Sequence, residues 1–166
     1  SNYKELTGDK SAMDAIICFK TADGKDGFIA IETKYSENLG TNEASNTDKA
    51  IETIRQLSCF NSAFEERINK KKTKLTQIYR NFLLSERYGL WIGAESYSIV
   101  LSPELHPSTD DEVLSVTNEM RPEYKGKLQS ITLESFTNKL ISESPEEYAE
   151  IFRRFRDRYL SFDRVE

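Results

Sequence analysis

Two runs of β-forming residues on either side of a turn dipeptide constrain the fold of this chain more than any other feature. The first run spans residues 13–20, the second spans residues 27–35, and Asp23-Gly24 lies between them. Ile, Phe, Ala and Cys supply most of the apolar positions, and Asp-Gly is a strong signal for a turn joining two antiparallel strands. The sequence therefore predicts a β-hairpin near the start of the chain.

Three charged residues occupy the ends of this hairpin, where a buried strand usually has none. Asp14 begins the first run, and Glu32 and Lys34 end the second. Since side chains alternate along a strand, Glu32 and Lys34 point to the same face as Phe28 and Ala30. Two carboxylates and an ammonium at this place favour a metal-dependent phosphodiesterase site, because hard divalent cations bind carboxylates and activate water.

The length of the hairpin loop decides whether Asp14 joins that face. A two-residue loop at Asp23-Gly24 would pair Asp14 with Thr33, on the wrong side. A three-residue loop would oppose Asp14 to Lys34, and a five-residue loop would oppose it to Glu32. We therefore predict an odd loop or a bulge at this turn.

In this interpretation each residue of the hairpin end has a chemical role. Asp14 and Glu32 bind Mg²⁺, for which Mn²⁺ can substitute, and the backbone carbonyl of Thr33 adds a ligand. The ammonium of Lys34 orients the attacking water and stabilises negative charge. The alternative is a set of exposed strand-end charges that pair with one another and contribute about 0 to 1 kcal/mol to the stability of the fold. The Glu-x-Lys pattern alone is weak evidence, because residues 123–125 repeat it in a turn-rich stretch.

Helices and further strands follow the hairpin. After a polar stretch, apolar spacing predicts a helix over about residues 50–64, capped by Asn46 or Thr47. A second helix, through Leu75 and Leu83, is expected to end at Gly89. The remaining expected elements are strands at 97–102 and 128–132 and helices at 110–119, 133–141 and 145–160.

The last of these helices combines an apolar stripe with many charges. Its apolar side chains recur at helical spacing, which predicts an amphipathic helix: Tyr148, Ile151, Phe152, Phe155 and Tyr159. Arginines between residues 153 and 158 lie near several Glu and Asp residues, so we expect surface ion pairs there.

Length and composition fit one α/β domain over residues 1–166, with a mixed central sheet flanked by helices. The chain is 37% hydrophobic and 31% charged, within the globular range. No apolar run is long enough to span a membrane, and we expect a cytoplasmic location. Cys18 and Cys59 are interpreted as buried apolar residues, and Trp91 and the other aromatic residues as core.

Residues 8–15 (Gly-Asp-Lys-Ser-Ala-Met-Asp-Ala) and 27–35 (Gly-Phe-Ile-Ala-Ile-Glu-Thr-Lys-Tyr) resemble the core of the PD-(D/E)xK nuclease superfamily, which has the restriction-endonuclease-like fold. The resemblance implies that Asp14 and Glu32 hold the metal and that Lys34 serves the water. Met13 replaces the Pro of the motif's name. The leading helix that often supplies another acidic ligand is missing or reduced, which leaves Glu5 as a weak candidate and suggests a missing N-terminal segment.

The resemblance extends to a downstream helix carrying Gln77 and Arg80, which it implies could touch substrate or brace the site. Together these features predict a Mg²⁺-dependent DNA endonuclease; the alternative is a non-catalytic module with the same fold that binds DNA or protein. RNA and branched DNA stay open as substrates.

The net charge of the chain affects how it would bind a nucleic acid. Its net charge of −5 argues against a sequence-independent coat on nucleic acid, although a basic run near Lys70 could contact phosphates. We therefore expect a missing segment or a second subunit to help with substrate binding. A homodimer would also bring two sites to the two DNA strands.

Overall fold

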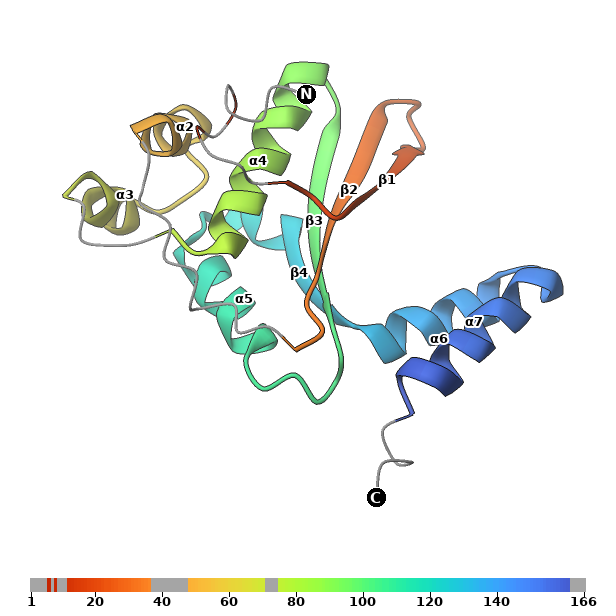
Figure 1. Cartoon of the computed structure of the whole chain (residues 1–166). Coiled ribbons are helices and arrows are strands. Elements are labelled where there is room, and N and C mark those ends of the chain that lie inside the picture. The colour runs from red at the N-terminus through yellow and green to blue at the C-terminus, as the bar shows by residue number, and fades with distance from the viewer. Residues whose placement is uncertain (1–5, 7, 9–11, 37–47, 71–74, 162–166) are drawn as a thin grey trace.

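A four-stranded mixed sheet with helices packed against it forms the centre of the molecule (Figure 1). The structure is a computed structural model that describes residues 6, 8, 12–36, 48–70 and 75–161. The strands lie in the order β1 (Ala15–Lys20), β2 (Asp26–Thr33), β3 (Glu95–Ser102) and β4 (Leu128–Thr132). The pair β1–β2 is antiparallel, and the other two pairings are parallel. This mixed α/β architecture confirms the predicted fold class and is consistent with a restriction-endonuclease-like core.

The sheet and helices alternate along the chain. The helices are α2 (Asp48–Leu57), α3 (Ser62–Asn69), α4 (Gln77–Ile92), α5 (Thr109–Glu119), the 3₁₀ helix η1 (Pro122–Lys127), α6 (Leu133–Glu143) and α7 (Glu146–Tyr159). No helix within these described ranges is long and apolar enough to cross a membrane.

The β1–β2 hairpin has a five-residue loop, which confirms the prediction of an odd loop. Lys20 pairs with Asp26 and Ala15 with Ile31, so that the loop comprises residues 21–25. Thr21 organises this loop, since its hydroxyl oxygen accepts the Lys25 N–H at 2.9 Å. Gly24 has φ of +83°, a backbone conformation that glycine adopts without strain. The register continues to place Asp14 opposite Glu32.

One expected helix is divided into two. The segment predicted as continuous over 50–64 forms α2 and α3, because Ser58 adopts φ of +48° and Asn61 starts a new helix by accepting the Phe64 N–H at 2.8 Å. The Asn46 and Thr47 caps predicted for α2 lie outside the described residues, as do Glu5 and the lysines at 71, 72 and 74.

Helix α4 extends past its predicted end at Gly89. It ends at Ile92, and Gly93, with φ of +70°, forms the left-handed cap. Gly89 instead allows close packing, because a Cβ there would lie 2.9 Å from the Ala94 carbonyl oxygen and 3.0 Å from Ser96 Cβ. The helix therefore continues until a residue that favours positive φ follows it.

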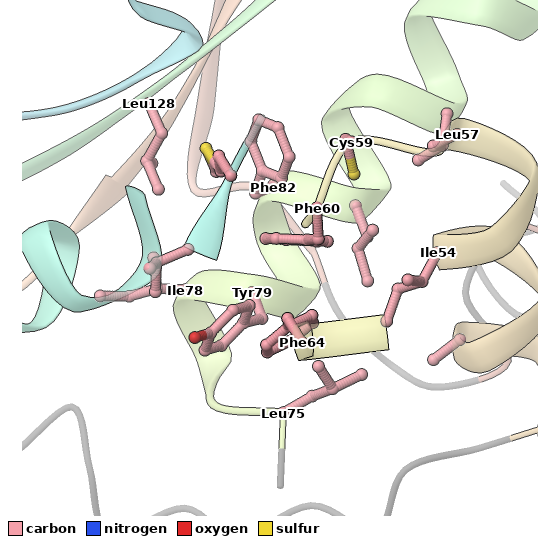
Figure 2. Packing of buried hydrophobic residues seen from close by; sticks show 14 of the residues in the cluster. Ile54, Leu57, Cys59, Phe60, Phe64, Leu75, Ile78, Tyr79, Phe82 and Leu128 are labelled. Atoms are coloured by element: carbon pink, nitrogen blue, oxygen red, sulfur yellow. The ribbon is translucent and has the colours of Figure 1, made fainter. Parts of the chain in front are cut away.

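The main hydrophobic core lies between one face of the sheet and helices α2, α3, α4 and α5. Aromatic rings fill its centre (Figure 2). The Phe60 ring lies 4.6 Å from that of Phe64, 5.6 Å from that of Tyr79 and 6.0 Å from that of Phe82, measured between centroids. Cys59 is buried beside them, as predicted. This packing fixes α4 against the sheet.

Cys18 and five of the aromatic residues predicted as core are exposed in the described part of the chain: Tyr35, Trp91, Tyr148, Phe155 and Tyr159. Cys18 lies on β1, an edge strand in which five of the six residues are exposed. Trp91 lies in the last turn of α4 and is 72% exposed, because α4 extends beyond the core at that end. An apolar residue type therefore did not ensure burial at these positions.

The second face of the sheet carries a smaller cluster around Ile31, Leu101, Leu133 and Leu160. Helices α6 and α7 follow β4 and extend away from the rest of the molecule as a helical pair (Figure 1). Tyr35 connects β2 to this pair, since its hydroxyl donates to the Tyr159 carbonyl oxygen at 2.6 Å.

Candidate active site

Glu32 and Lys34 form a buried ion pair at the end of β2. Each residue is only 6% exposed, and Lys34 Nζ lies 2.7 Å from Glu32 Oε1. The alternating pattern of β2 directs both side chains toward the sheet face that α4 covers, as the sequence predicted. The alternative of fully exposed strand-end charges is thus wrong for this pair. A buried pair needs further hydrogen bonds to offset the loss of hydration.

Helix α4 supplies those hydrogen bonds. Gln77 Nε2 donates to Glu32 Oε1 at 2.6 Å, and Asn81 Nδ2 donates to Glu32 Oε2 at 2.7 Å. The two amides are four residues apart and therefore share one face of the helix. Three side-chain donors thus fix the orientation of the Glu32 carboxylate.

Asp14 directly precedes β1, and continuing the hairpin register by one residue places it opposite Glu32. Its backbone N–H donates to the Ile31 carbonyl oxygen at 3.0 Å, and its Oδ2 accepts the Thr33 N–H at 2.8 Å. Unlike Glu32, Asp14 is exposed. One carboxylate of the hairpin end is therefore open to solvent while the other is enclosed.

The environment of Glu32 disfavours its charged form. Burial is the main cause that raises the pKa of Glu32 above its usual 4.5; the hydrogen bond and charge of Lys34 lower the pKa, and the negative charge of Asp14 raises it. The pKa of Glu32 is therefore higher in the folded chain than in the unfolded chain. At a pH between these two pKa values, Glu32 is more often protonated in the folded chain. The contribution of Glu32 to stability therefore decreases as the pH rises from about 4.5 through the folded pKa.

Replacing Lys34 with methionine is expected to raise the pKa of Glu32 further. The variant keeps much of the side-chain volume and removes both the hydrogen bond and the charge that lower this pKa. A ¹³C-carboxyl NMR titration of Glu32 measures the effect, with Lys25→Met in the exposed hairpin loop as the control. A pKa of Glu32 that stays constant or falls in Lys34→Met would contradict the assigned contact.

The structure assigns different positions to the two residues predicted to touch substrate. Gln77 contacts Glu32 directly and so lies at the site. Arg80 is half-buried on the same helix, and the hydrogen bonds described for Glu32 come from other residues. Asn81 is the residue that sequence reasoning missed, and its i, i+4 spacing from Gln77 is the signal that would have identified it.

Asn81→Leu is expected to lower any metal-dependent activity by about 10- to 100-fold, as for other residues that orient a metal ligand. The substitution removes the amide that donates to Glu32 Oε2 and keeps a similar volume. Activity and the metal concentration for half-maximal rate are measured together. Gln56→Leu is the matched control, because that amide is exposed on α2 and donates to Glu52. Equal activities of Asn81→Leu and Gln56→Leu would contradict a role for Asn81 in orienting a metal ligand.

The donor chemistry at the hairpin end fits a hard divalent cation. Mg²⁺ is usually held by one or two carboxylates together with water and substrate phosphates. Asp14 and Glu32 provide two carboxylates. The negative charge of Asp14 raises the pKa of Glu32, and a cation beside both carboxylates would offset this repulsion. Within the described part of the chain, no group of three or more His, Cys, Asp or Glu residues surrounds a common point. A cation here would therefore take most of its ligands from water and substrate.

A comparison with known protein families shows to which family this chain is related. Residues 2–160 match the family described as "Restriction Endonuclease associating with ARP", or REase-ARP. The chain belongs to the REase-ARP family. No curated protein and no solved structure matches it. The REase-ARP match covers the hairpin, α4 and the α6–α7 pair alike, so the hairpin-end residues belong to a restriction-endonuclease-related chain.

Proposed function

We propose that this REase-ARP protein is a Mg²⁺-dependent DNA endonuclease of the PD-(D/E)xK type. The observation that carries the proposal is the buried Glu32–Lys34 pair, with Asp14 opposite Glu32 because of the five-residue loop. A buried ion pair adds little stability relative to apolar residues of the same volume. Burial of such a pair next to another carboxylate is typical of functional sites.

Each residue at the hairpin end has a separate task in phosphodiester hydrolysis. Asp14 and Glu32 would hold Mg²⁺, and the Thr33 carbonyl is proposed as a further ligand. When bound, the cation would polarise the phosphate and lower the pKa of a bound water. Lys34 holds a positive charge beside Glu32, where its ammonium can donate to the attacking water or to a phosphate oxygen.

Helix α4 positions this machinery. Gln77 and Asn81 keep the Glu32 carboxylate in one orientation, and such pre-organisation removes a cost that a mobile carboxylate would add in the transition state. Arg80 is proposed to contact a substrate phosphate or to brace the helix.

A second candidate function is a non-catalytic module that keeps the fold and binds DNA or protein. The observation that favours it is that both carboxylate oxygens of Glu32 already accept hydrogen bonds from protein side chains. A carboxylate enclosed in this way can act as a structural connection between β2 and α4.

Plasmid cleavage distinguishes the two functions. Wild-type protein is incubated with supercoiled DNA in Mg²⁺, in Mn²⁺ and with a chelator, next to Lys34→Met and the exposed control Lys25→Met. The endonuclease proposal requires cleavage in metal by wild type and Lys25→Met, and its loss with chelator and in Lys34→Met. Intact DNA in both metals, repeated with RNA and branched DNA, would favour the non-catalytic module.

A further inference from the structure

Helix α7 exposes a row of large apolar side chains. Tyr148, Ile151, Phe155 and Tyr159, here termed the α7 apolar stripe, are 52%, 59%, 39% and 45% exposed. Their spacing of three, four and four residues places them along one side of the helix. The sequence predicted an apolar stripe at these positions, and in a single chain the body of the protein leaves it largely uncovered.

The stripe is separate from the side of α7 that faces α6. Ala149 is the buried residue of α7, and Phe152, Arg153 and Arg156 are half-buried, as expected for the side that contacts α6. Helix α6 in turn buries Leu133 and Thr137. A pair of helices that buries so few apolar residues gains little stability from its own packing. Cover over the stripe would supply the missing apolar contact.

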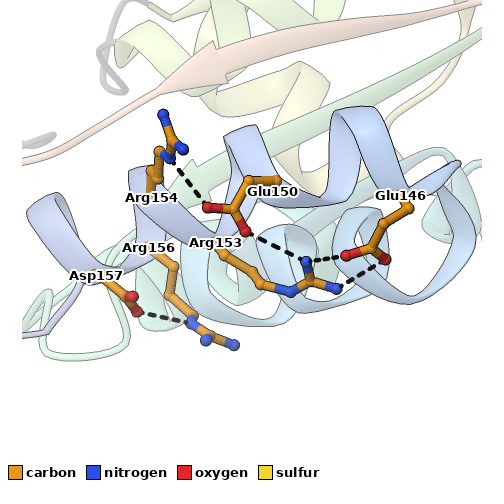
Figure 3. Close-up of polar contacts among 6 residues, drawn as sticks. All are labelled: Glu146, Glu150, Arg153, Arg154, Arg156 and Asp157. Atoms are coloured by element: carbon orange, nitrogen blue, oxygen red, sulfur yellow. Dashed lines mark hydrogen bonds and ion pairs between the residues drawn. The ribbon is translucent and has the colours of Figure 1, made fainter.

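Charge is divided between the two halves of α7. Residues 146–152 contain three Glu and no basic residue, whereas residues 153–159 contain four Arg and one Asp. Ion pairs within the helix join the halves (Figure 3): Arg153 Nη1 lies 2.7 Å from Glu146 Oε1, and Arg154 Nε lies 3.0 Å from Glu150 Oε1. Although these pairs join the halves, the N-terminal half carries an excess of three negative charges and the C-terminal half an excess of three positive charges.

This pattern of charge is complementary to itself when two copies run in opposite directions. The acidic half of one α7 then lies against the basic half of the other at both ends. The stripe has the same symmetry, because Tyr148 and Tyr159 flank Ile151 and Phe155 at nearly equal distances from the midpoint near Arg153 and Arg154. A parallel pairing would oppose like charges.

We propose that the α7 apolar stripe is the dimer interface of this protein and that two copies pair antiparallel through α7. Stripe side chains of one chain pack between those of the other, with charged residues at the rim, as in antiparallel helix pairs. The hairpin-end site lies on another part of the chain, so that each protomer keeps its own Asp14, Glu32 and Lys34. The interface does not depend on the proposed nuclease activity.

Mass measurement by light scattering and sedimentation tests the interface without DNA or metal. At about 100 µM protein, a concentration that populates even a micromolar dimer, we expect a mass of twice the 19.1 kDa of one chain. Replacing both Ile151 and Phe155 with Asp is expected to raise the dissociation constant at least about 100-fold, because two central apolar contacts are lost. Both positions are exposed in one chain, so circular dichroism should match wild type. A monomeric wild type would overturn the proposal.

Charge exchange tests whether the charged residues of α7 meet across the interface. One variant carries Glu147→Lys with Glu150→Lys, and the other carries Arg154→Glu with Arg158→Glu. Each is expected to be monomeric alone, since its two copies present like charges, and an equimolar mixture is expected to form a heterodimer. A mixture that stays monomeric, or single variants that dimerise as strongly as wild type, would overturn the proposed pairing.

Discussion

Asp14→Asn is expected to lower the rate of DNA cleavage by about a thousandfold. Metal ions contribute several kcal/mol to transition-state stabilisation, and roughly 4 kcal/mol corresponds to this factor. The substitution removes the charge of a proposed metal ligand and retains an oxygen that can accept the Thr33 N–H, as Asp14 Oδ2 does at 2.8 Å. Because Asp14 is exposed, we expect the free energy of unfolding to change by less than about 1 kcal/mol.

The same variant separates catalysis from folding better than a change at Glu32. Glu32→Gln would leave the buried Lys34 ammonium without its anion, and loss of one partner of a buried pair destabilises a protein by about 3 to 5 kcal/mol. Asp26→Asn serves as the matched control for Asp14→Asn, because Asp26 is an exposed carboxylate at the other end of the hairpin. Initial rates at saturating Mg²⁺ are compared, and an Asp14→Asn rate above about one-tenth of wild type would contradict the assigned role.

Phe60→Ala is expected to lower the free energy of unfolding by about 3 to 5 kcal/mol, as for other fully buried Phe residues. Phe60 is 0% exposed and its ring contacts those of Phe64, Tyr79 and Phe82. Removing the ring leaves a cavity where α2, α3 and α4 meet (Figure 2). Since a domain of this size is stable by only about 5 to 15 kcal/mol, much of the stability would be lost.

Trp91→Ala is the control for this substitution. It removes a larger ring from α4, but Trp91 is 72% exposed and its described ring contact is with Tyr88, at 5.8 Å between centroids. We expect a loss below about 1 kcal/mol. Urea unfolding measures both variants, and equal losses of stability would contradict the described core.

The hairpin was the part of the fold that sequence reasoning predicted best. Its alternation and turn residues specify strands directly, and the need to place Asp14 beside Glu32 selected an odd loop, which the five-residue loop at 21–25 confirms. The strand at 128–132 was also predicted with its observed bounds. Local patterns are sufficient for such elements, because period and turn chemistry act over a few residues.

Tertiary contacts decided the features that sequence reasoning missed. Apolar spacing continues across Ser58, but the cap formed by Asn61 and the bridge between Phe60 and Met120 divide the helix there. The exposure of Trp91 and Cys18 depends on where α4 ends and on β1 being an edge strand. Asn81 reaches Glu32 because α4 packs beside β2, which is a tertiary contact.

The central claim is that Asp14 and Glu32 bind one divalent cation next to Lys34. Anomalous diffraction from crystals of the protein grown with Mn²⁺ tests it most directly, with Asp14→Asn crystals as the comparison. We predict one strong Mn²⁺ peak in contact with carboxylate oxygens of both Asp14 and Glu32, and its loss in the variant. Crystals at saturating Mn²⁺ without a peak between these two residues would contradict the claim.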